Sequence, residues 1–200
     1  MERNYTLPTI AWLRATDYLH GWLQSQLGCA AMVGNQKIVC VQHLEGAKQI
    51  LKMETREDAL GEKCQSPVAM SAKRYNCVTA GLQLDEQAVG EMYGVKREEL
   101  PLYVPIEVPK MCTTSAGVLR PWTLNTSFGY KQAGELLKLL RDEFWKAVAQ
   151  YDRQYAKKKQ GRPYPAIDMI EAFCRDTQTN DIYAEPLRRE WQRRQKRQKH

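Results

Sequence analysis

Residues 130–158, YKQAGELLKLLRDEFWKAVAQYDRQYAKK, carry the longest periodic pattern in the chain. Their apolar residues recur at intervals of three and four, the spacing that places side chains on one face of an α-helix. Asp142 precedes Lys146 by four residues on the opposite face, which is the favourable order for an ion pair. The pattern predicts a helix over about 130–158, with Thr126 or Ser127 as its N-cap. The apolar stripe consists of Ala133, Leu136, Leu137, Leu140, Phe144, Val148, Tyr151 and Tyr155.

Two shorter helices are predicted after this long one. The segment PAIDMIEAFCRD, residues 165–176, has helical spacing, and a proline fits the start of a helix. A last helix begins near 183–186, where Tyr183, Leu187 and Trp191 follow one another at intervals of four and form an apolar stripe. No apolar residue follows Trp191, so we expect only the first turns of this helix to be packed. The sequence therefore predicts a C-terminal bundle of three helices.

The end of the last helix is strongly basic. LRREWQRRQKRQKH, residues 187–200, holds seven cations and one acid, so it carries +6 of the formal net charge of +7. Such an asymmetry indicates contact with nucleic acid or another acidic surface. On a helix, Arg189, Arg193, Lys196 and Arg197 fall along one side. The seven cations are Arg188, Arg189, Arg193, Arg194, Lys196, Arg197 and Lys199.

Three interpretations of this basic end are open. Arginine donates two hydrogen bonds to a phosphate through its planar guanidinium, so DNA or RNA with low sequence specificity is one partner. Cations near a helix C-terminus are also favoured by the helix dipole, although this accounts for two or three of them and not seven. The third interpretation is an acidic protein partner. We expect a non-enzymatic nucleic-acid-binding or nucleic-acid-associated protein, with a protein-interaction or assembly module as the alternative.

A second pattern suggests nucleic-acid binding more weakly. Residues 85–103 combine a short helical pattern, a glycine at position 94 and the cations Lys96 and Arg97, an arrangement that resembles a helix-turn-helix. Lys96 and Arg97 would then begin the recognition helix. However, Pro101 would stop that helix after one turn. The alternative is a single capped helix that ends at Gly94.

The N-terminal part is predicted to be an α-β-β-α unit over residues 9–53. Apolar spacing predicts a helix over 9–27, and the pair Gly34-Asn35 suits a two-residue hairpin turn. Helical spacing returns over 43–53. Residues 54–129 are mixed and irregular, and the prolines at 101, 105 and 109 suggest an extended or edge segment.

These elements predict one α+β, helix-dominated domain over residues 1–200: an N-terminal helix-hairpin-helix unit and a C-terminal helical bundle with a basic end, 130–200. No run of about 18 apolar residues occurs, so no membrane contact is expected. The six cysteines form no C-x-x-C pair and are expected to be reduced in a cytoplasmic protein.

Catalytic and cofactor patterns are weak, so an enzyme is the less favoured class. The sequence lacks the glycine-rich nucleotide loops and the G-x-S-x-G pattern. His20 and His43 lack the converging ligands of a metal site, so no metal or cofactor is predicted. A Cys40–His43 nucleophilic pair, or a nuclease-like set of Asp85, Glu107 and Lys110, would need support from geometry.

Overall fold

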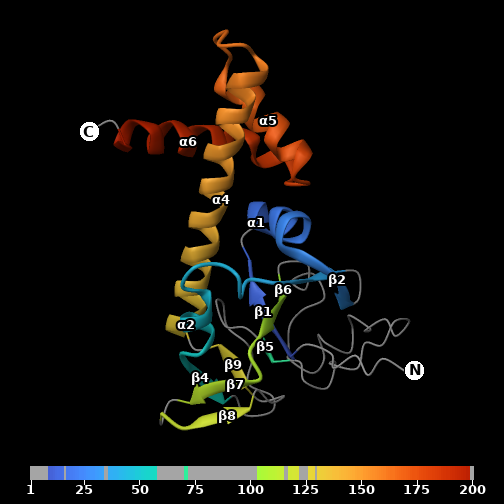
Figure 1. Ribbon diagram of the computed structural model, residues 1–200, viewed down its shortest axis with the longest axis vertical. Helices are drawn as coiled ribbons and strands as arrows, with labels where there is room; N and C mark the ends of the chain where they lie inside the picture. Colours follow the sequence, from blue (N-terminus) through green and yellow to red (C-terminus); the bar gives the residue numbers. More distant parts are fainter. Residues whose placement is uncertain are drawn as a thin grey trace. The chain divides into compact units, whose positions relative to one another are not determined.

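The computed structural model describes residues 9–15, 17–33, 36–57, 70–71, 103–114, 117–121, 126–128 and 130–198. The fold is α+β and rich in helix, as predicted, and the chain divides into two compact units (Figure 1). The first unit contains the strands and comprises Met1–Thr16 and Leu27–Leu139. The second unit is helical and comprises Asp17–Gln26 and Leu140–His200. The expectation of a single domain stays a prediction.

A five-stranded sheet forms the centre of the first unit, in the order β2-β3-β6-β1-β5. Neighbouring strands are antiparallel except β3 and β6, which are parallel through the pair Val39 and Ile106. The strands are β1 (Thr9–Arg14), β2 (Gly28–Val33), β3 (Gln36–Val39), β5 (Met70–Ser71) and β6 (Tyr103–Val108).

The predicted helix over 9–27 is wrong in its first half, where the chain forms β1. Ile10, Ala11 and Leu13 are all 0–1% exposed, so neighbouring residues on both faces of the strand are buried. A continuous run of apolar residues is typical of an inner strand. Over only six residues, the same run also fits the apolar spacing of a helix. Pairing with β6 along the whole of β1 decides between the two. The predicted helix-hairpin-helix unit is therefore not shown.

The second half of that segment is helical, as α1 (Asp17–Trp22) and a following π-helical turn (Leu23–Leu27). The two arms of the predicted hairpin also pair, since β2 and β3 are antiparallel with Val33 opposite Gln36. A short helix, α2 (Ala47–Leu51), occupies the middle of the predicted 43–53 helix.

The proline-containing segment is extended, as predicted, but its strand β6 lies inside the sheet, between β3 and β1, and not at an edge. Only Pro105 falls within the paired residues, so one backbone donor is lost. Tyr103, Val104, Ile106 and Val108 are all at most 3% exposed. Their burial outweighs the missing hydrogen bond and accounts for an inner strand here.

A second, four-stranded sheet has the order β8-β7-β4-β9. Two of its strands correct the sequence predictions: β4 falls in a stretch predicted to be irregular, and β9 contains Thr126 and Ser127, which therefore do not cap the long helix. The strands are β4 (Glu54–Glu57), β7 (Met111–Thr114), β8 (Leu119–Pro121) and β9 (Thr126–Phe128).

The long helix α4 spans Tyr130–Lys158, as predicted. In the first unit, the buried side chain of Gln132 donates hydrogen bonds to the carbonyl oxygens of Ile50 and Leu51, at 3.0 and 3.3 Å. These carbonyls belong to the last turn of α2, beyond which the helical hydrogen bonds stop, and that of Ile50 also accepts from the Met53 backbone nitrogen at 3.1 Å. The contact therefore ties the start of α4 to α2.

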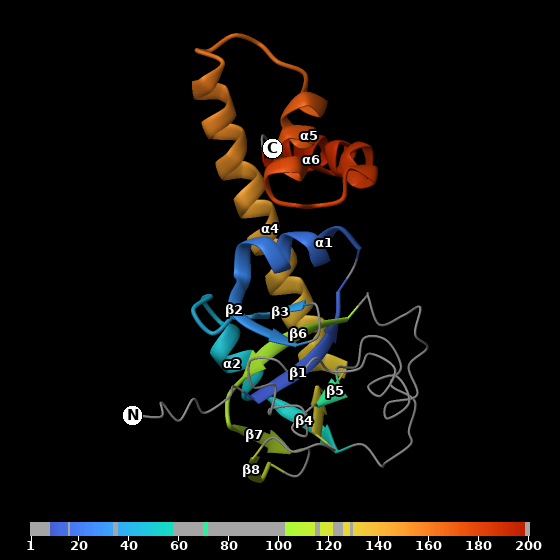
Figure 2. The ribbon, with the colours of Figure 1, turned by 90° about the vertical axis from the view of Figure 1, so that its right-hand side faces the viewer.

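The second unit packs α1, α5 (Ala166–Asp176) and α6 (Ala184–Gln198) with the part of α4 after Leu140. Figure 2 shows α5 and α6 beside this part of α4. The ring of Phe144 lies at its centre, with ring centroids 5.1–5.6 Å from those of four aromatic neighbours. These neighbours are Tyr18, Trp22, Trp145 and Phe173.

The loop between α5 and α6 closes against α1. Thr177 and Thr179 are buried, and their hydroxyl oxygens lie 3.0 Å apart in a hydrogen bond. Ser25 donates a hydrogen bond to the carbonyl oxygen of Thr177. Gly21 lies so close to this loop that a Cβ atom there would lie 2.2 Å from the carbonyl oxygen of Gln178. Glycine is therefore required at position 21 for this packing.

Candidate nucleic-acid interface

Helix α6 begins at a defined turn, close to the predicted start at 183–186. The Asn180 side chain accepts a hydrogen bond of 3.1 Å from the backbone nitrogen of Ile182, and a 3₁₀ turn, Asp181–Tyr183, leads into α6. Asparagine is a favoured cap because its side-chain oxygen accepts from backbone donors that lack a helical partner. This turn fixes where the basic helix starts.

Trp191 anchors α6 to α4. Its ring lies parallel to that of Trp145, with 3° between the planes and 6.2 Å between the centroids. Leu187 and Trp191 are only 4% and 6% exposed, which confirms two members of the predicted docking stripe, whereas Tyr183 lies in the preceding 3₁₀ turn and is half-buried. Beyond Trp191 the described residues are polar or charged and mostly exposed, and Figure 1 shows this end of α6 extending away from α4.

The two arginines before Trp191 share one carboxylate. Arg188 Nη2 lies 2.6 Å and Arg189 Nε 2.9 Å from Glu185 Oε1. These hydrogen bonds, with that of Arg188 the stronger influence, lower the pKa of Glu185 to about 2. The carboxylate is therefore ionised at neutral pH, and two arginines compete for a single negative charge.

The next two arginines share Glu190. Arg193 Nη1 lies 3.6 Å from Glu190 Oε2, and Arg194 Nε lies 3.4 Å from Glu190 Oε1. The Arg194 guanidinium also lies over the ring of Trp145, 4.8 Å from its centroid. Arg194 is thus held by the protein itself, whereas the Arg193 side chain is 68% exposed. Exposed pairs of this kind contribute at most about 1 kcal/mol, so they exchange readily for a phosphate.

Lys196 and Arg197 are exposed and, within the described part of the chain, form no ion pair. Along α6 as a whole, six cations are accompanied by two carboxylates, so the helix keeps a net charge of +4. The structure therefore places all six predicted cations of residues 188–197 on one helix and leaves its last turns the most available. Lys199, and the proposed helix-turn-helix with Lys96 and Arg97, lie outside the described residues.

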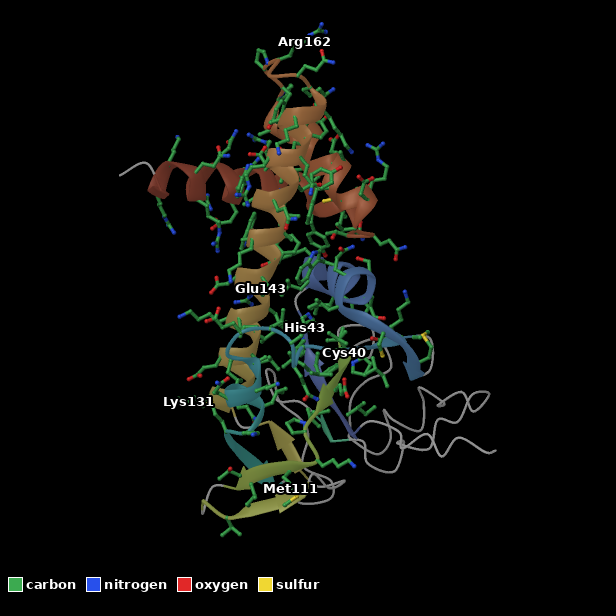
Figure 3. All side chains as sticks on the ribbon, in the orientation of Figure 1. Cys40, His43, Met111, Lys131, Glu143 and Arg162 are labelled. Atoms are coloured by element: carbon green, nitrogen blue, oxygen red, sulfur yellow. The ribbon has the colours of Figure 1, made fainter. Side chains whose placement is uncertain are left out.

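Sequence reasoning missed a second cationic group, at the end of α4 and in the loop after it. Residues 153–162 contain five cations and no acid, and all five are exposed. Arg162 lies at the far end of this loop (Figure 3). A run of basic residues within ten positions was the available signal. The group, called the α4-end cluster below, consists of Arg153, Lys157, Lys158, Lys159 and Arg162.

Two tyrosines of this unit donate hydrogen bonds to carboxylates. Tyr151 donates a hydrogen bond of 2.6 Å to Asp176 Oδ2, and Tyr164 donates one of 2.8 Å to Asp152 Oδ1. Burial, reinforced by these hydrogen bonds, raises the pKa of both tyrosines to about 12. Asp152 and Asp176 thus accept hydrogen bonds from phenol groups. Among the described residues, neither acid forms an ion pair with a cation of the cluster.

These tyrosines predict an alkaline loss of stability. The folded state holds both phenol protons more tightly than the unfolded chain, whose tyrosines titrate near pH 10. The stabilisation is complete below about pH 10 and is lost as the pH rises towards 12. We expect the free energy of unfolding to fall over this range, and to fall less steeply in the Tyr151→Phe, Tyr164→Phe double variant. Urea unfolding at several alkaline pH values measures both slopes, and equal slopes would contradict the assignment.

The Cys40–His43 pair gains no support from the geometry, and the set of Asp85, Glu107 and Lys110 includes Asp85, which lies outside the described residues. Burial is the main cause of a raised pKa at Cys40, and neighbouring Glu107 and Cys29 raise it further, so this thiol stays protonated and is a poor nucleophile. His43, the other member of the Cys40–His43 pair, is exposed in the turn after β3. No cluster of three or more metal-binding side chains occurs among the described residues.

Searches of known protein-family models, curated proteins and solved structures found no match to this chain. The described helices include none that is long and apolar enough to cross a membrane. The candidate interface therefore rests on its own charge, exposure and geometry.

Proposed function

We propose that this protein binds nucleic acid without strong sequence preference, through phosphate contacts made by the basic end of α6. One observation carries the proposal: the last turns of α6 extend beyond the Trp191 anchor with exposed cations, and the helix keeps +4 after its two carboxylates are counted. Phosphate contacts of this kind supply affinity and orientation but no sequence information.

The intramolecular ion pairs of α6 are compatible with this role. Each carboxylate is shared by two guanidinium groups, so half of the positive charge of these four arginines is uncompensated. The pairs also hold the side chains along the helix, which lowers the entropy lost when a phosphate binds. Lys196 and Arg197 supply further donors beyond these pairs.

Replacing three cations of α6 tests the proposal. The variant Arg193→Gln, Lys196→Gln, Arg197→Gln should bind duplexes of two unrelated sequences about 10–100-fold more weakly than the wild type, because three phosphate contacts are lost. Fluorescence anisotropy at low salt measures the affinity. Substitution is preferable to truncation after Leu187, since truncation would also remove Trp191 and its contact with Trp145.

A matched control removes the same charge elsewhere. Lys131, Lys138 and Arg141 are exposed on α4 and lie outside the basic groups described above. Changing all three to Gln should leave the affinity within about twofold of the wild type. If both triple variants lost the same affinity, net charge alone would explain the loss, and a site on α6 would be contradicted. Absence of binding at low salt would leave an acidic protein partner as the better hypothesis.

A further inference from the structure

We infer that the bound nucleic acid is double-stranded and that it contacts the α4-end cluster as well as α6. This inference rests on the proposed function and adds to it a substrate class and a second contact site. Its support comes from the charge available at the end of α4, from the engagement of the aromatic rings near both sites, and from the distance between the sites.

The α4-end cluster keeps a net positive charge when the nearby acids are counted. Its five cations have no acid among them in residues 153–162, and the carboxylates of Asp152 and Asp176, which accept hydrogen bonds from neutral tyrosines and stay negative, reduce the charge from +5 to +3. The dipole of α4 favours Lys157 and Lys158 in its last turn, but a helix terminus carries only about half an elementary charge. A net positive charge of more than +2 therefore remains for an external anion.

The aromatic rings near both sites are already engaged by the protein. Trp145 contacts both the Trp191 ring and the Arg194 guanidinium, and both tryptophans are 6% exposed. Tyr155 stacks on Tyr151, meets Tyr164 edge to face, and lies under the Lys159 ammonium group. Proteins that hold single strands stack bases on exposed aromatic faces. Because the two tryptophans are buried and the half-buried tyrosines contact one another, these rings offer little free surface for base stacking, and the phosphates of a duplex are the better match.

The two sites lie within reach of one duplex. Both helices can be followed outward from the contact between Trp145 and Trp191. Lys158 is thirteen residues beyond Trp145, or about 20 Å along α4, and Arg197 is six residues beyond Trp191, or about 9 Å along α6. Packed helix axes lie about 8–10 Å apart, so the two backbones are at most about 40 Å apart, the length of roughly twelve base pairs at 3.4 Å each.

The experiment compares probe types and lengths with the full chain. The probes are a labelled duplex of about 18 base pairs, its single strand, and a hairpin with a stem of about six base pairs, each as DNA and as RNA. We expect the wild type to bind the long duplex at least about tenfold more tightly than the single strand. The variant Lys157→Gln, Lys158→Gln, Lys159→Gln should bind the long duplex about 10–100-fold more weakly than the wild type.

The short hairpin isolates the need for both sites. Its stem is about 20 Å long and offers fewer phosphates for simultaneous contact with both sites, so loss of the α4-end cluster should weaken its binding less than that of the long duplex. The Lys131→Gln, Lys138→Gln, Arg141→Gln variant again serves as the control for net charge. A stronger response to the DNA or the RNA duplex identifies which of the two the site prefers.

The outcomes separate this inference from the proposed function. If the α6 variant loses affinity while the α4-end variant matches the control, the second contact is refuted and the proposed function stands. Equal affinity for single strand and duplex refutes the duplex preference. If no probe binds the wild type, both the inference and the proposed function are overturned.

Discussion

Phe144→Ala should lower the free energy of unfolding of the helical unit by about 3–5 kcal/mol, the usual cost of removing a buried phenylalanine ring. Phe144 is fully buried, and four aromatic rings contact it from α1, α4 and α5. Removing the ring leaves a cavity in the middle of the cluster, and no single neighbour can fill it without losing its other contacts. Urea unfolding followed by tryptophan fluorescence measures the change.

Phe144 also connects the core to helix α6 through its ring contacts. Phe144 packs edge to face on Trp145, which in turn stacks on Trp191 of α6. Phe144→Leu keeps most of the volume and should cost about 1.5 kcal/mol or less. A loss of under 1 kcal/mol for the alanine variant would show that this cluster is not the core of the unit.

Gly21→Ala should destabilise the helical unit by about 3 kcal/mol, at the upper end of the range for overpacking. The added Cβ would lie 2.2 Å from the Gln178 carbonyl oxygen and 3.2 Å from the Cα of Thr179, both backbone atoms. Gln178 already has a positive φ of 54°, so the loop has little freedom to move away. The substitution should therefore separate α1 from the 177–179 loop.

Gly134→Ala is the matched control for this prediction. Gly134 is also helical, but a Cβ there would meet no atom within 4 Å. Alanine is the better helix former, so this variant should gain about 0.5–1 kcal/mol. Calorimetric or urea unfolding of the two variants should give changes of opposite sign. A neutral Gly21→Ala variant would show that α1 does not pack against the loop as described.

Long periodic patterns predicted the helical unit well. The stripe from Ala133 to Val148 defined α4, and Leu187 and Trp191 defined the docked face of α6. Short segments failed because six residues satisfy helical and strand periodicity equally, as in β1. The inner position of β6 could not be predicted from its prolines, since pairing with strands distant in sequence determines how much one missing donor costs.

The candidate interface was only partly predictable. The cations of α6 followed from composition, and the sharing of Glu185 and Glu190 could have been read from their spacings of three and four to the arginines. The position of Arg194 over Trp145 depends on how α6 crosses α4, which no local pattern reveals. The α4-end cluster was missed because lysines in the last turn of a helix are ordinarily attributed to its dipole.

The central claim is that the exposed cations of α6 contact phosphates. The most direct test is the dependence of duplex affinity on salt, because each neutralised phosphate contributes about −0.9 to the slope of log K against log salt concentration. The wild type should show a slope of about −3 or steeper. The Arg193→Gln, Lys196→Gln, Arg197→Gln variant should be shallower by about 2–3, and the Lys131→Gln, Lys138→Gln, Arg141→Gln control should keep the wild-type slope. A wild-type slope near zero, or an α6 variant with an unchanged slope, would contradict the account.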